Sequence, residues 1–138
     1  MFSSLLMNIL TKDNMKNYSV FEYLYRDANN FKAFGELLLS GKITNDYVTE
    51  LNSYLYSGEF FVAEQVNVPT LYSHLWEYSN GPTISDHAFH EFSSLRPATN
   101  EEVSSLDLWG ESSNMIVAFR MASQQSWDCS LSVHCAAF

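Results

Sequence analysis

YSVFEYLYR, at residues 18–26, alternates aromatic or aliphatic side chains with polar ones, which is the pattern of a strand that buries one face. The next four residues, DANN at 27–30, are turn formers, and a second apolar run, FKAFGELLL, occupies residues 31–39. Two strand-forming runs on either side of a short polar turn predict a β-hairpin over residues 18–39.

A helix is predicted directly after the hairpin, over residues 44–56. Thr44 offers a capping hydroxyl at its start. Val48, Leu51 and Leu55 repeat at helical spacing, so one face of this helix can bury against the hairpin.

Shorter elements are predicted in the rest of the chain. Strands are expected over residues 59–66 and 87–95, and short helices after Pro69 and from Asn100. The run 114–122 is apolar enough for either a buried strand or a helix. The chain then alternates as a final strand would, through Trp127, Cys129, Leu131, Val133 and Cys135. Together these elements predict an α+β fold, a small antiparallel sheet begun by the N-terminal hairpin and packed against one or two helices.

Length and composition indicate one folded unit. The chain has 138 residues, of which 46% are hydrophobic and 15% aromatic. This composition is far from that of a disordered protein, and the length is close to the commonest domain size. We expect residues 15–138 to form a single α+β domain. The sequence pattern changes near Met15, so residues 1–14 are expected to be an N-terminal extension.

The charge of the chain restricts its partners. Sixteen acidic and seven basic side chains give a formal net charge of −9. This charge repels phosphate backbones and anionic lipids, so direct nucleic-acid binding and membrane binding are not expected. No segment has the roughly 20 apolar residues that span a bilayer. A basic protein partner fits this charge better.

The two cysteines form no recognisable site. Cys129 and Cys135 are the only cysteines, and their spacing matches no common zinc or redox motif. We expect them to be reduced and buried. A cytoplasmic location is expected by default, because the sequence opens with no targeting leader and has no membrane span.

The densest cluster of chemically active side chains is Asp86-His87-Ala88-Phe89-His90-Glu91. Imidazole and carboxylate groups bind transition metals, but the order His-x-x-His-Glu is neither that of zincins nor that of inverzincins. On a helix His87, His90 and Glu91 would share a face, whereas on the strand preferred here His90 points away from the other two. Two interpretations stay open: a metal or acid–base site with Asp86 orienting an imidazole, or solvated polar residues on an edge strand.

Two further groups of residues could contribute to binding. Arg26 and Asp27 end the first strand and could present an ion pair to a ligand, although Asp27 could equally hold the turn. Aromatic side chains supply much of the energy of protein recognition. Five of them could line an apolar groove or pack in the core: Phe60, Phe61, Tyr72, Trp76 and Tyr78.

Three segments of the chain resemble a family of small uncharacterised bacterial proteins. These segments are YRDANNFK at 25–32, FVAEQV at 61–66 with Pro69, and Asp86-His87 with His90-Glu91. The resemblance covers residues 18–98 and implies no activity, cofactor or substrate. It places the first 14 residues and the part after Pro97 outside the shared unit.

Function classes follow from the motifs that the sequence holds and lacks. It contains no nucleophile elbow and no glycine-rich phosphate loop, and it indicates no particular cofactor. The leading hypothesis is therefore a non-enzymatic interaction or ligand-binding protein that uses Arg26, Asp27, Trp76, His87, His90 and Glu91. The alternative is a small metal-assisted hydrolase that uses His87, His90 and Glu91. A third hypothesis is an acidic protein that imitates nucleic acid.

Overall fold

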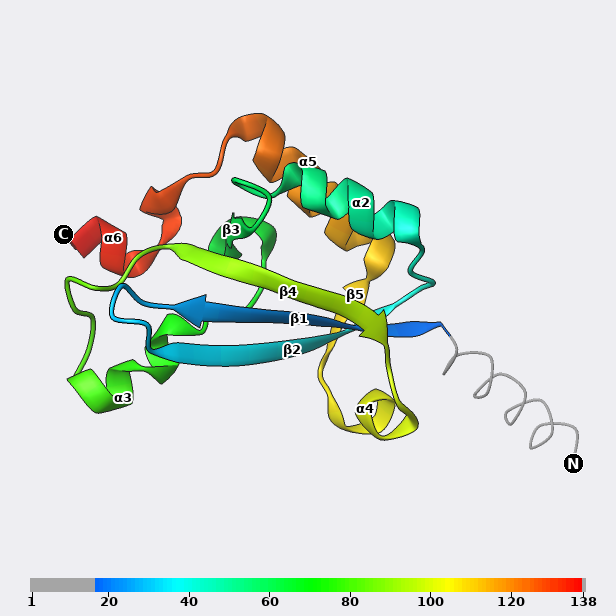
Figure 1. The fold of residues 1–138 in the computed structure, drawn as a ribbon, viewed down its shortest axis with the longest axis horizontal. Coiled ribbons are helices and arrows are strands. Elements are labelled where there is room, and N and C mark those ends of the chain that lie inside the picture. Colours follow the sequence, from blue (N-terminus) through cyan, green and yellow to red (C-terminus); the bar gives the residue numbers. More distant parts are fainter. Residues whose placement is uncertain (1–16, 138) are drawn as a thin grey trace, which may run out of the picture.

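The computed structural model describes residues 17–137, which form a five-stranded sheet and several helices (Figure 1). The strands are β1 (Tyr18–Arg26), β2 (Lys32–Ser40), β3 (Phe60–Val62), β4 (Phe89–Pro97) and β5 (Leu108–Glu111). The α-helices are α2 (Asn45–Tyr54), α3 (Trp76–Ser79), α4 (Asn100–Ser105), α5 (Ser112–Gln125) and α6 (Val133–Ala137), and 3₁₀ helices cover Ala63–Val66, Tyr72–His74 and Cys129–Leu131. The α+β fold class predicted from the sequence is confirmed. The predicted extension, residues 1–14, lies outside the described residues.

Strand β1 is the centre of the sheet, whose order is β3-β4-β1-β2-β5. It pairs antiparallel with β2 along its whole length, from Tyr18 opposite Ser40 to Arg26 opposite Lys32, and antiparallel with β4 on its other side. Strand β5 instead joins β2 in parallel, because the chain returns through α4 before β5 begins (Figure 1). The predicted antiparallel sheet begun by a hairpin is therefore inexact: the sheet is mixed, and the hairpin occupies its middle.

The alternating pattern of β1 sorts its side chains onto two faces. Phe21, Tyr23 and Tyr25 are buried on one face, and Glu22 and Arg26 are half-buried on the other. The buried rings join a continuous aromatic core, in which burial of apolar area supplies the main driving force for folding. This core holds the end of the hairpin rigidly, which positions the candidate site described below.

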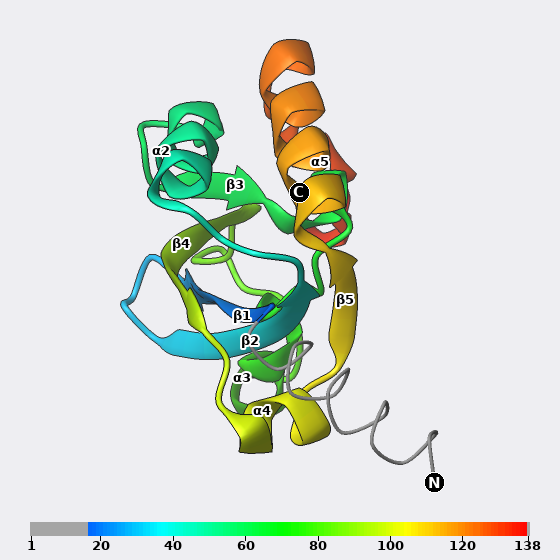
Figure 2. The same ribbon diagram turned by 90° about the vertical axis from the view of Figure 1, so that its right-hand side faces the viewer.

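Helices α2 and α5 lie side by side above the sheet, and Figure 2 shows α5 passing close to the β3 and β5 edges. Thr44 caps α2 as predicted, because its hydroxyl accepts a hydrogen bond from the Tyr47 N–H at 3.1 Å. The expected partner of this helix was the hairpin. Leu51 and Leu55 join the core that also holds hairpin residues of β1 and β2. The helix packs along α5 as well, where the Tyr47 hydroxyl donates to the Ser112 carbonyl at 2.6 Å and Glu50 pairs with Arg120 at 2.6 Å.

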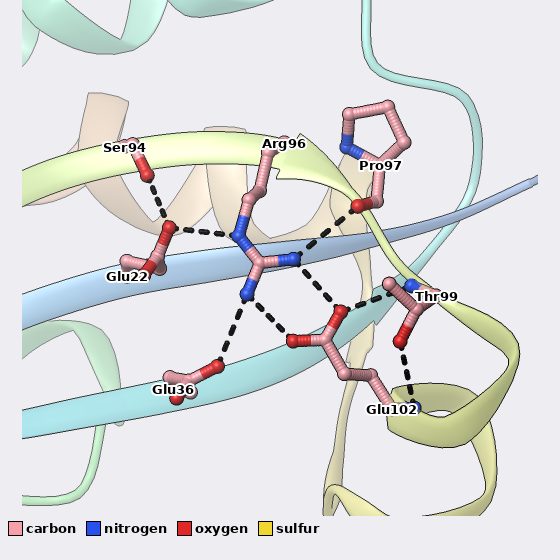
Figure 3. A network of polar contacts seen from close by, with 7 residues as sticks. All are labelled: Glu22, Glu36, Ser94, Arg96, Pro97, Thr99 and Glu102. Atoms are coloured by element: carbon pink, nitrogen blue, oxygen red, sulfur yellow. Dashed lines mark hydrogen bonds and ion pairs between the residues drawn. The ribbon is translucent and has the colours of Figure 1, made fainter.

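An ion-pair network ties α4 to the outer face of the sheet (Figure 3). The Arg96 guanidinium contacts the carboxylates of Glu22, Glu36 and Glu102 at 2.9, 3.2 and 2.6 Å. Hydrogen bonds from Arg96 and from the Thr99 backbone lower the pKa of Glu102 to about 2. Thr99 and Glu102 also form a capping box at the start of α4. The network fixes the turn that leads from β4 towards β5.

The C-terminal third corrects the sequence prediction. The open alternative at 114–122 resolves as helix α5, and β5 was not predicted. The predicted final strand at 127–135 is wrong, since a 3₁₀ helix and α6 occupy this stretch. The physical reason is local: the Asp128 carboxylate accepts a hydrogen bond from the Ser130 N–H, which turns the chain into a helix start. Cys129 and Cys135 are free thiols and only half-buried.

Among residues 17–137, no helix combines the length and the apolar character that crossing a membrane requires.

Candidate functional site

The residues singled out in the sequence gather at one end of the sheet, where β1 turns into β2 and β4 begins. Backbone and side-chain hydrogen bonds join this turn to the loop before β4: the Ala28 N–H donates to the Ser85 carbonyl at 2.9 Å, and the Asn29 amide donates to the Ser85 hydroxyl at 3.0 Å. Helix α3 reaches the same end in Figure 1. The hairpin turn therefore meets α3 and the loop before β4, which are close to each other in the sequence but distant from the turn.

His90 lies in the core beneath this end, with 0% of its surface exposed. Its Nε2 accepts a hydrogen bond from the Leu71 N–H at 3.0 Å, so the proton of the neutral ring is on Nδ1, which faces the Ala88 carbonyl at 3.3 Å. Burial lowers the pKa of His90 to about 4. Both ring nitrogens are used inside the protein, and neither reaches the surface.

His87 and Glu91 are closer to the surface but are also engaged by neighbouring groups. The His87 Nδ1 accepts from the Phe89 N–H at 3.1 Å, and its Nε2 donates to the Arg26 carbonyl at 2.6 Å. Glu91 forms an ion pair with Arg26 at 3.0 Å, from β4 to β1. Within residues 17–137, no three His, Cys, Asp or Glu side chains are arranged to hold a metal ion. The metal interpretation of His87, His90 and Glu91 stays a prediction that this geometry does not support.

Asp86 joins three segments of the site. Its carboxylate accepts hydrogen bonds from the Tyr25 hydroxyl at 2.5 Å, the Trp76 Nε1–H at 3.0 Å and the Thr83 N–H at 2.9 Å. Burial alone would raise the pKa of Asp86, but these hydrogen bonds outweigh it and the pKa is lowered. The Tyr25 hydroxyl accepts in turn from the His87 N–H at 3.1 Å. Asp86 therefore positions Trp76 and the loop, a role that the sequence interpretation did not include.

Arg26 and Asp27 hold the hairpin turn. The Asp27 Oδ1 atom accepts hydrogen bonds from the backbone N–H groups of Asn29 and Phe31, both at 2.9 Å. Arg26 donates to the Asn30 side chain at 2.7 Å, and Asn30 adopts a positive φ of 68°. The turn is thus fixed from both sides.

A cavity of about 530 Å³ lies between this turn and α3. Its apolar lining comes from Phe31, Leu75, Trp76 and Tyr78, and its polar lining from Asp27, Asn29, Lys32, Ser79, Thr83, Ser85 and Asp86. Phe31 and Tyr78 stand at its rim with 65% and 87% of their surface exposed. The cavity falls within the range of about 300–1,000 Å³ that is typical of ligand sites. We call it the turn cavity.

A second, shallower cavity of about 360 Å³ lies next to the same turn. It is lined by Arg26, Asp27, Tyr56, Phe60, His87, Phe89 and Glu91. The Tyr56 and Phe89 rings stack at one wall, with centroids 5.2 Å apart and an interplanar angle of 22°. The sequence-predicted residues thus divide between two cavities, with Asp27 at both and His90 below them.

The predicted aromatic groove is divided between core and cavity. Phe61 and Tyr72 are buried core residues, whereas Trp76 and Tyr78 line the turn cavity and Phe60 lines the second one. Phe31 was not singled out in the sequence, because it was interpreted as part of a strand. Its position directly after the turn signal was the available clue.

No protein-family model matches the chain, and no curated protein or solved structure matches it either.

Proposed function

We propose that this protein is a non-catalytic binding module whose partner inserts an apolar side chain into the turn cavity. The observation that carries the proposal is the cavity itself: its volume suits a ligand group, and two of its aromatic side chains, Phe31 and Tyr78, remain largely exposed. Exposed aromatic rings beside a concave surface are favourable anchors for a partner.

The cavity is held in a fixed shape before any partner arrives. Trp76 cannot rotate freely, because its Nε1–H donates to the Asp86 carboxylate, and the same carboxylate fixes the loop at Thr83. The opposite wall rests on the turn that Asp27 holds. Such preorganisation reduces the entropy that binding costs.

Charge indicates a basic partner. The chain carries a net charge of −9, and the Asp27 Oδ2 atom at the cavity has no hydrogen-bond partner in the described part of the chain. Glu77, on α3 beside the cavity-lining Trp76 and Tyr78, is exposed. We propose a polypeptide with an aromatic or aliphatic anchor flanked by Arg or Lys, because long-range attraction would then assist its approach.

A binding role also accounts for the way the polar groups are used. Around the two cavities the imidazole of His87 and the carboxylate of Asp86 are occupied by structural hydrogen bonds. A hydrolase would need at least one such group free to activate water or to bind a metal ion. The proposal retains the cytoplasm of a bacterium as the location, where the free thiols of Cys129 and Cys135 would stay reduced.

The test is selection from a library of random twelve-residue peptides displayed on phage. Wild-type protein is the bait, and a Phe31→Ala/Tyr78→Ala double variant is the counter-bait. We expect enriched peptides that combine an aromatic or large aliphatic residue with Arg or Lys, and binding that the double variant weakens at least about tenfold. Loss of two exposed aromatic anchors accounts for an effect of this size.

A matched control is the Val117→Ala/Met121→Ala variant, which removes two exposed apolar side chains from α5, away from the cavity. It should bind the selected peptides as the wild type does. Failure to enrich any sequence family, or equal binding by both double variants, would contradict the proposed function.

A further inference from the structure

Residues 131–134, in the C-terminal segment 129–137, have an inverted burial pattern. Leu131 and Val133 are exposed, with 48% and 73% of their surface accessible. The alternating residues Ser132 and His134 are buried, with only 0% and 1% of their surface accessible. An amphipathic segment that docks permanently places its apolar side chains inside and its polar ones outside. Residues 131–134 do the reverse, so docking of the segment buries polar side chains and leaves apolar ones in contact with water.

The buried polar groups of the segment find no partners in the protein. The Ser132 hydroxyl and both ring nitrogens of His134 have no hydrogen-bond partner within the described residues, and neither has the Oε1 atom of Glu64. Buried polar atoms of this kind lose hydrogen bonds to water without replacing them. Docking of the segment is therefore opposed by the very side chains that it buries.

Few polar contacts hold the segment down. Upstream, the chain is anchored: Trp127 donates through Nε1 to the Tyr54 carbonyl at 3.0 Å, and the Asp128 N–H donates to Gln65 at 2.8 Å. Beyond Asp128, the Ser132 and Cys135 N–H groups donate only to carbonyls within the segment. The segment contacts the rest of the fold through a backbone hydrogen bond of Val133 to the Tyr72 hydroxyl.

Aromatic contacts make up the interface beneath the segment. The His134 ring meets Tyr72 edge-on, with centroids 4.3 Å apart, and lies 6.0 Å from the Trp76 ring. Trp76 is also part of the lining of the turn cavity. The segment thus contacts both the core residue Tyr72 and the cavity-lining Trp76.

We infer that residues 129–137 form a detachable strap, which opens as a unit about the anchor at Trp127 and Asp128 while the sheet and α5 stay folded. Opening returns Ser132 and His134 to water, where their polar atoms regain hydrogen bonds, and it uncovers Tyr72 and one side of Trp76. Opening of the strap does not require the turn cavity to bind a partner. If the cavity does bind one, the shared Trp76 connects the two events.

Native-state hydrogen exchange measured by mass spectrometry tests the strap on the full chain. Amides of 129–137 should exchange through an opening that depends weakly on urea, while amides of β1 exchange only through global unfolding. The same free energy and the same urea dependence for both regions would overturn the inference.

Two variants sharpen the test. Ser132→Ala removes an unpartnered buried hydroxyl, and His134→Phe replaces the unpartnered ring while keeping an aromatic edge on Tyr72. Ser132→Ala should lower the opening constant of the strap about tenfold, which corresponds to about 1.4 kcal/mol. His134→Phe should lower it in the same direction. Ser104→Ala, at an exposed serine of α4, should leave it unchanged.

The reactivity of the two native thiols is a second measure of strap opening, independent of hydrogen exchange. Cys135 and Cys129 should react with a thiol reagent more slowly in Ser132→Ala than in the wild type, because detachment exposes them. Unchanged exchange and unchanged thiol labelling in both strap variants would show that the buried polar groups do not control docking, and would overturn the inference.

Discussion

Replacement of His90 by Gln should remove a specific part of the acid sensitivity of this protein. The buried imidazole is neutral in the folded protein, where burial lowers its pKa from 6.5 to about 4. Between these two values the unfolded chain binds a proton that the folded chain does not bind. Stability therefore falls as the pH falls through this range.

The size of the effect follows from the two pKa values. Once both states titrate, the difference between 6.5 and about 4 corresponds to about 3 kcal/mol of unfolding free energy. Between pH 7 and pH 5 the contribution of His90 alone is about 2 kcal/mol. Carboxylates with lowered pKa values, such as those of Glu22, Asp86 and Glu102, also lose stabilisation on acidification, so only a comparison with a variant isolates the histidine.

Gln is the matched substitution because its side-chain oxygen can accept the hydrogen bond from the Leu71 N–H that Nε2 of His90 accepts. Urea unfolding of the wild type and of His90→Gln should be measured at pH 7 and pH 5. We expect the wild type to lose about 2 kcal/mol more than the variant over this interval. An equal loss in both proteins would refute the assignment of a neutral, buried His90.

Three other substitutions test the packing and the hydrogen bonds of the fold by urea unfolding. Gly35→Ala should cost about 1–3 kcal/mol, because its Cβ would lie 2.6 Å from the Cε1 atom of the buried Tyr23 ring; an unchanged midpoint would show that the ring can move aside. Tyr25→Phe should cost about 1–3 kcal/mol, since Asp86 loses a donor and the His87 N–H loses its acceptor; a neutral result would contradict the role of this hydroxyl. Thr99→Ala should cost about 1 kcal/mol by removing the cap of α4, whereas Thr99→Ser should retain it.

The parts of the fold that the sequence predicts are those with local causes. The alternation in 18–26 and the capping hydroxyl of Thr44 act within a few residues, and both elements appear where they were expected. Strand β5 has only four residues, too few for a period to show, and its parallel partner β2 is distant in the chain. The alternation at 127–135 is present in the sequence but misleading, since Asp128 starts a helical turn and the buried positions are the polar ones.

The candidate site shows the same division between local and distant causes. The cluster Asp86 to Glu91 was recognised from composition, and its residues do lie at one end of the sheet. What their side chains do depends on groups from distant segments: the Leu71 amide at His90 and the Arg26 carbonyl and ion pair at His87 and Glu91. No spacing within the cluster reveals these partners.

The hydrogen bonds that occupy the polar cluster also give the turn cavity its shape. If Asp86 moved to act as a catalytic group, Trp76 and the Thr83 loop would lose the acceptor that positions them. A carboxylate that fixes an indole and a loop has its hydrogen-bonding capacity committed to structure. The cavity surface left for a partner is mainly apolar, with polar groups such as Asp27 in its lining. The strap, whose His134 ring also contacts Trp76, buries polar groups without partners and leaves apolar ones exposed. This indole is thus positioned by the hydrogen bond to Asp86, and it also contacts a segment that gains hydrogen bonds on leaving. We therefore expect movement at this site to come from the strap and not from the cavity wall.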